Sequence, residues 1–137
     1  SKVSGLCFLA ISNTFQGKFQ EAHQSLEAVK SVKDDSLSFW DHVSISKATA
    51  NLAAVEGRWE ESFEKLEELT VTYAQKGYRW AHAHTLCDWG DVFVSRGETS
   101  DFESARGLYN QALEIYKDLE ATWYQEQVGK RLSRITP

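Results

Sequence analysis

Four side chains that could do chemistry lie close together in the second half of the chain: His84, Cys87, Asp88 and Asp91. A thiol three residues from an imidazole could form a thiolate pair on a helix. The surrounding sequence indicates neither a third residue to orient such a pair nor a set of donors for an oxyanion. We therefore interpret Cys87 as a buried thiol and expect no catalytic residues.

A metal site is the second chemistry that the sequence suggests, because His82 and His84 form an HAH pair. Residues two apart on a helix point in different directions, so these two imidazoles cannot readily bind one metal ion. The other two histidines, His23 and His42, stand alone. Motifs for a phosphate loop, a dinucleotide loop and a nucleophile elbow are absent from the sequence. We expect no metal, no cofactor and no enzymatic activity.

The composition argues against two classes of partner. With 20 acidic and 15 basic residues, the formal charge of -5 offers no general attraction to nucleic acid or to an anionic membrane. The longest uncharged apolar run, residues 5–11, is too short to span a membrane. Cys7 and Cys87 are too far apart in sequence to indicate zinc or a disulfide framework. Because the run at residues 5–11 also lacks the flanks of a signal peptide, we expect a cytoplasmic protein. The chain contains no Met, so either the initiator has been removed or, as we expect, the chain is a fragment of a longer protein.

An internal repeat organises the chain. Gly17, Gly57 and Gly97 recur at a period of forty residues, and an aromatic residue and an acid follow each of them. A stripe of small and large apolar residues at i, i+4 and i+7 comes next, as in Ala22, Leu26 and Val29, and is typical of one helical face. Small residues precede the turn glycines at a similar interval: Ala10, Ala50, Gly90 and, beginning a fourth unit, Gly129.

These signals predict an all-α protein built from helical hairpins. A small residue within a helix allows a neighbouring helix to approach closely, and a glycine after the helix provides a left-handed C-cap. The predicted helices cover residues 3–16, 19–33, 38–56, 59–76, 79–96, 101–119 and 122–134. They form three hairpins and one additional helix.

The third unit resembles the tetratricopeptide repeat family through Gly90, Phe93, Ala105, Tyr109 and Ala112. The resemblance implies a single domain, residues 1–137, that forms a right-handed α-solenoid of three antiparallel hairpins and a C-terminal capping helix. Its repeats would cover residues 1–36, 37–77 and 78–121, followed by the terminal helix 122–137. The long period is similar to that of repeats in large bacterial signalling ATPases and transcription activators.

In this family the first helix of each hairpin lines a groove, so the resemblance implies that a protein or peptide partner binds there. The implied groove residues are Cys7, Ile11 and Thr14, then Lys47, Asn51 and Ala54, then His84, Cys87, Asp88 and Asp91. Lys47 and Asn51 match a pair that holds a peptide carboxylate in some family members. Asp88 and Asp91 would instead accept a basic segment of a partner, or would simply face water.

The resemblance implies a protein-interaction scaffold or regulatory module without catalysis. One alternative is self-association, since an unfinished fourth repeat would expose the apolar face formed by Tyr124, Val128, Leu132 and Ile135. A second alternative is effector sensing in a multidomain signalling ATPase or transcriptional regulator. Five aromatic residues near helix starts, Tyr124 among them, would either pack between hairpins or serve as association hot spots: Trp40, Tyr78, Trp80, Trp123 and Tyr124.

Overall fold

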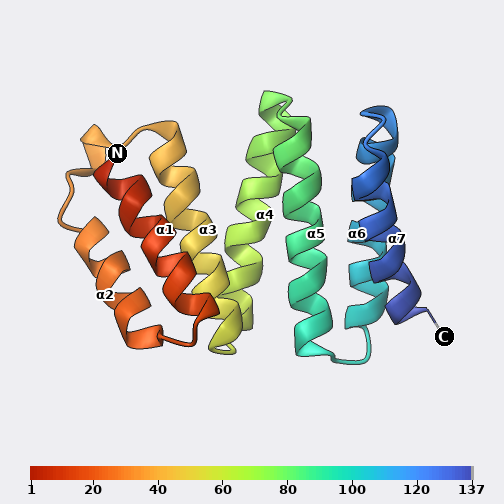
Figure 1. Ribbon diagram of the computed structural model, residues 1–137, viewed down its shortest axis with the longest axis horizontal. Helices are drawn as coiled ribbons and strands as arrows, with labels where there is room; N and C mark the ends of the chain where they lie inside the picture. Colours follow the sequence, from red (N-terminus) through yellow and green to blue (C-terminus); the bar gives the residue numbers. More distant parts are fainter. Residues whose placement is uncertain (137) are drawn as a thin grey trace. The chain divides into compact units, whose positions relative to one another are not determined.

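The computed structural model describes residues 1–136, and these residues form seven α-helices and one short 3-10 helix, η1, without strands. The all-α prediction is confirmed. The elements in chain order are α1 (Lys2–Phe15), α2 (Phe19–Val29), η1 (Asp34–Ser36), α3 (Phe39–Val55), α4 (Trp59–Lys76), α5 (Arg79–Arg96), α6 (Asp101–Asp118) and α7 (Thr122–Ile135) (Figure 1). Within residues 1–136, no helix combines the length and the hydrophobicity that a membrane crossing requires.

The helix boundaries follow the predicted ones closely, except at the end of α2. This helix ends at Val29 and not at residue 33. The hydroxyl of Ser31 donates to the carbonyl of Ala28 at 2.7 Å, and the amide of Val32 donates to the carbonyl of Val29 at 3.0 Å. Such local bonds from serine compete with the helical ladder and explain the early end.

Left-handed residues end several helices, as the glycine spacing predicts. Gly17, Gly57 and Gly97 have φ values of 76°, 76° and 69°. Two further left-handed residues were not predicted: Gly77 after α4, with φ of 72°, and Glu120 after α6, with φ of 56°. Glutamate rarely adopts the left-handed conformation, so the residue type at position 120 did not indicate a turn.

The chain divides into two compact units, residues 1–65 and the chain from Leu66 onward, and the division falls within α4. In the first unit α1 packs against both α2 and α3. A capping box begins α3, in which Ser38 and Asp41 satisfy each other's backbone amides. The Ser38 amide and the Ser1 hydroxyl both donate to Asp41 and hold the pKa of its carboxyl below its usual value. One core cluster of this unit contains Val3, Cys7, Ala10, Val29 and Ala48.

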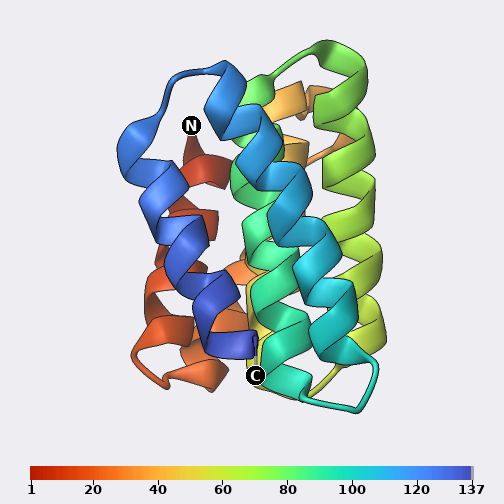
Figure 2. The same ribbon diagram turned by 90° about the vertical axis from the view of Figure 1, so that its right-hand side faces the viewer.

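In the second unit α5 packs against α6, and α6 packs against α7 (Figure 2). Gly90 lies against the ring of Tyr109, so closely that an added Cβ would be 2.5 Å from its Cε1 atom. Asp101 is the first residue of α6, and its carboxylate accepts bonds of 2.8 and 2.7 Å from Arg96 at the end of α5 and one of 2.9 Å from the amide of Glu98. The hydrogen-bonded guanidinium of Arg96 lowers the pKa of the Asp101 carboxyl. These contacts fix the ends of α5 and α6 that flank the site described next.

Candidate functional site

In the first unit, the groove residues predicted on α1 are mostly committed to the core. Cys7 and Thr14 are buried, and the hydroxyl of Thr14 donates to the carbonyl of Ala10 at 2.8 Å. Ile11 is partly buried and packs against the core of the unit. The prediction that Cys7 and Thr14 are open to a ligand is therefore wrong, because the inner side of α1 is covered by α2 and α3.

The residues predicted on α3 are more open. Lys47 is exposed, and Asn51 and Ala54 are partly exposed at intervals of about one helical turn. The described chain shows no ion pair for Lys47. A carboxylate-binding role for Lys47 and Asn51 therefore stays a prediction.

The thiol and imidazole on α5 do not form a reactive pair. Cys87 is buried, and burial raises the pKa of its thiol to about 12. His84 is hydrogen-bonded through Nδ1 to the hydroxyl of Tyr116 on α6. A thiol with this pKa is protonated at neutral pH, and the protonated form is a poor nucleophile.

We expect Cys87 to react slowly with a thiol reagent. At pH 8 the folded chain should consume a disulfide reagent such as dithionitrobenzoate at least about a hundredfold more slowly than the urea-unfolded chain, because both cysteines are buried and Cys87 is protonated. A Cys7→Ala variant assigns the remaining signal to Cys87. Rapid modification of that variant under native conditions would contradict the buried, protonated thiol.

Asp91 is the centre of a polar network that joins three helices. Its carboxylate accepts bonds of 2.9 and 3.2 Å from the guanidinium of Arg131 on α7 and one of 2.6 Å from the hydroxyl of Tyr109 on α6. The predicted role of Asp91 in accepting a basic segment of a partner stays a prediction: its carboxylate is paired within the chain, but its side chain is still partly exposed. Asp88 is exposed, and its predicted role stays untested.

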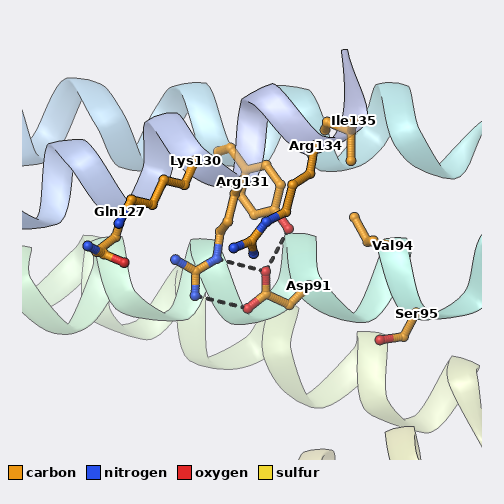
Figure 3. Close-up of a pocket in the computed structure, with 9 residues that line it drawn as sticks. Asp91, Val94, Ser95, Gln127, Lys130, Arg131, Arg134 and Ile135 are labelled. Atoms are coloured by element: carbon orange, nitrogen blue, oxygen red, sulfur yellow. Dashed lines mark hydrogen bonds and ion pairs between the residues drawn. The ribbon is translucent and has the colours of Figure 1, made fainter. Parts of the chain in front are cut away.

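A pocket of about 380 Å³ lies beside this network, and we call it the basic pocket (Figure 3). Arg131 and Arg134 reach into it from α7 toward the face of α5 that carries Asp91. Three bases and one acid line it, which gives the lining a formal charge of +2 in a chain whose total is -5. The lining residues are Asp91, Val94, Ser95, Tyr109, Gln127, Lys130, Arg131, Arg134 and Ile135.

The positive charge of the basic pocket is only partly compensated by the chain. Asp91 pairs with Arg131, and the hydrogen bonds between them raise the pKa of the Arg131 guanidinium. No ion pair within residues 1–136 involves Lys130 or Arg134. Arg106 donates to the carbonyl of Ile135 at 3.2 Å and so offsets the negative end of the α7 dipole. The pocket therefore favours an anion.

A second, smaller pocket of about 170 Å³ adjoins the first, and we call it the aromatic pocket. Tyr116 and Tyr124 stack in it with ring centroids 5.1 Å apart, and Trp123 meets Tyr124 edge-on at 5.0 Å. Trp123 is 61% exposed and so lies at the mouth of the pocket. The lining residues are Cys87, Tyr116, Trp123, Tyr124, Gln127, Val128 and Arg131.

The apolar face of α7 points inward. Val128 belongs to the core of the second unit, and the other three members of the predicted self-association surface pack against that core: Tyr124, Leu132 and Ile135. Val128 is therefore not available to a second copy in the folded chain, whereas Tyr124, Leu132 and Ile135 are only partly buried, and self-association through this face stays a prediction. Among the aromatic residues near helix starts, Trp80, Trp123 and Tyr124 join one cluster.

The basic residues of the site were not among the predicted groove residues. Lys130, Arg131 and Arg134 lie on α7, which the sequence presents as a cap and not as a groove helix. Their spacing does contain a signal, since residues 130 and 134 are one turn apart on the same face. Among residues 1–136, no group of three or more His, Cys, Asp or Glu side chains is placed to hold a metal ion.

In comparisons with known proteins, neither the family models nor the curated protein sequences gave a match to this chain.

Proposed function

We propose that the chain is a right-handed, tetratricopeptide-like solenoid segment that acts as a protein-interaction module and catalyses no reaction. In this proposal the basic pocket binds an acidic segment of a partner protein. One observation carries it: Lys130, Arg131 and Arg134 line a single pocket, and only one carboxylate of the described chain compensates them there.

The geometry of Arg131 supports binding without large rearrangement. Its guanidinium donates two bonds to the carboxylate of Asp91, and the hydroxyl of the buried Tyr109 donates to the same carboxylate and holds Asp91 in turn. A side chain that is already fixed loses little conformational entropy when a ligand arrives. Lys130 and Arg134, one turn apart on α7, then supply charge-assisted hydrogen bonds to the incoming anion.

Charge reversal in the basic pocket is expected to remove binding of an acidic peptide. The probe is a fluorescein-labelled peptide of four Asp-Gly units, and its affinity is measured by fluorescence anisotropy at low and moderate salt. The double variant Lys130→Glu/Arg134→Glu should lose at least about tenfold in affinity, because two attractive charges become repulsive. Both positions are exposed, so the fold should persist.

A matched control separates the pocket from the overall charge. The variant Lys18→Glu/Lys33→Glu changes the net charge by the same amount at two exposed positions of the first unit and should bind like the original chain. Equal losses in both variants would mean that the peptide follows net charge and not the pocket. Equal affinity for a Lys-Gly peptide of the same length would also overturn the proposal.

A further inference from the structure

We infer that the basic pocket and the aromatic pocket form one bipartite site for an extended protein segment. The segment places an anionic side chain in the basic pocket and, two positions away along the same segment, a bulky apolar side chain in the aromatic pocket. The inference rests on the proposed function and deepens it, because it specifies which acidic segments the site selects.

The two pockets adjoin each other. Gln127 and Arg131 line both of them, so the two spaces meet at these two side chains. The pockets differ in chemistry on either side of these residues: the basic pocket continues toward Lys130 and Arg134, whereas the aromatic pocket continues toward Tyr116 and Trp123. One ligand can therefore contact both only if it carries both kinds of group.

The aromatic pocket suits one apolar side chain. Its volume of about 170 Å³ has room for a single Leu or Phe side chain. Its walls are held by the stacked Tyr116 and Tyr124, by the bond between Tyr116 and His84, and by the buried Val128. Trp123, largely exposed at the mouth, would cover an apolar side chain that enters, as aromatic residues do at binding hot spots.

The spacing of the two groups follows from helix geometry. On α7 the lining residues of the two pockets are displaced by about five positions, which is roughly 7 Å at 1.5 Å per residue. In an extended segment, residues two apart are separated by roughly 6.6 Å and point to the same side. Residues one apart point to opposite sides, so they cannot fill both pockets. The geometry therefore selects a spacing of two.

The anionic group can be a carboxylate or a phosphate. Both accept paired hydrogen bonds from guanidinium and ammonium groups, and both match the residual positive charge of the basic pocket. A phosphoserine carries roughly twice the charge of an aspartate at neutral pH, so Lys130 and Arg134 together would hold it more tightly. The peptides in the test therefore contain either group.

The test uses the full chain and fluorescein-labelled ten-residue peptides of Gly and Ser. Each peptide carries one Leu and one anionic residue, Asp or phosphoserine, at a spacing of one, two or three, with Leu on either side. A reference peptide for each anion has Gly in place of Leu. The peptides with a spacing of two are expected to bind about tenfold more tightly than their references, and a spacing of one should give no gain.

A variant at the mouth of the aromatic pocket localises the gain. Trp123→Ala should reduce the Leu effect at least about threefold and leave the affinity of the reference peptides unchanged. Trp40 is another exposed tryptophan and lies in the first unit. The substitution Trp40→Ala should change neither the Leu effect nor the affinity of the reference peptides. A circular dichroism spectrum and melting temperature close to those of the original chain would show that the Trp123 variant is folded.

Each other outcome has a definite meaning. If the reference peptides bind but Leu adds nothing at any spacing, the bipartite site is overturned and the proposed acidic-segment binding stands. If Leu adds affinity equally at spacings of one, two and three, or if the gain survives Trp123→Ala, the two-pocket geometry is overturned. If no peptide binds, neither charge nor Leu is recognised, and the proposed function fails together with the inference.

Discussion

Replacing Gly90 by Ala is expected to lower the free energy of unfolding of the second unit by about 2 kcal/mol. The new methyl group would lie 2.5 Å from Cε1 and 2.9 Å from Cδ1 of Tyr109. The ring cannot simply move away, because Tyr109 is buried in the core and its hydroxyl is bonded to Asp91. The loss is expected even though Ala gains about 1 kcal/mol over Gly in helix propensity.

Gly129→Ala is the matched control for this substitution. Gly129 lies within α7, as Gly90 lies within α5, but an added Cβ there meets no atom within 4 Å. This variant should gain about 1 kcal/mol from helix propensity alone. Urea unfolding, followed by tryptophan fluorescence and by circular dichroism, measures the free energy of unfolding of both variants. If Gly90→Ala is as stable as Gly129→Ala, then the ring of Tyr109 can shift, and the close approach of α6 to α5 does not depend on glycine.

The contrast between the two glycines shows how far the repeat pattern predicts packing. The sequence places Gly90 and Gly129 at equivalent repeat positions, but only Gly90 has a ring against it. The helix that follows Gly90 is α6, which supplies Tyr109, and no such helix follows α7 within the described chain. A repeat pattern thus predicts which positions permit close approach, whereas the partner helix determines whether the approach occurs.

Helix positions were predictable because their signals are local. The repeat pattern and the i, i+4, i+7 stripes predict the bounds of α4 and α5 to the residue, and a glycine C-cap ends α5 as expected. The misplaced end of α2 and the turn at Glu120 depend on hydrogen bonds that residue type alone does not indicate. Ser31 bonds backward to Ala28, and the amide of Ala121, which follows Glu120, bonds to the carbonyl of Tyr116.

The candidate site was less predictable because its charges act across helices. The sequence presents Asp91 as an acid on a groove face, and its partner Arg131 lies forty residues away. That separation equals the repeat period, so opposite charges at this offset are a usable signal for a pair on equivalent helices. The net charge of -5 likewise does not indicate the basic pocket, because the total charge of a chain does not report where its basic side chains lie in the fold.

A charged side chain at position 128, near the centre of α7, is expected to disrupt the packing of this helix against the rest of the second unit. Val128 is only 1% exposed and belongs to the core formed with α5 and α6. Val128→Asp should lower the free energy of unfolding by about 3 to 5 kcal/mol, since a carboxylate would be buried without a partner. The same variant should also lose binding of the Asp-Gly peptide, because both pockets depend on the position of α7.

Ser133→Asp provides the control, because it adds the same charge to an exposed position of the same helix and should change the stability by no more than about 0.5 kcal/mol.

This pair of variants also tests self-association through α7. Sedimentation velocity and urea unfolding are measured on the same samples across a wide concentration range. If Val128→Asp keeps the original stability but dissociates an oligomer, the apolar face of α7 must be an interface between copies and not part of the core. If stability falls as expected, any accompanying change in association reflects the unfolding of α7, since a side chain buried within its own unit cannot contact a second copy.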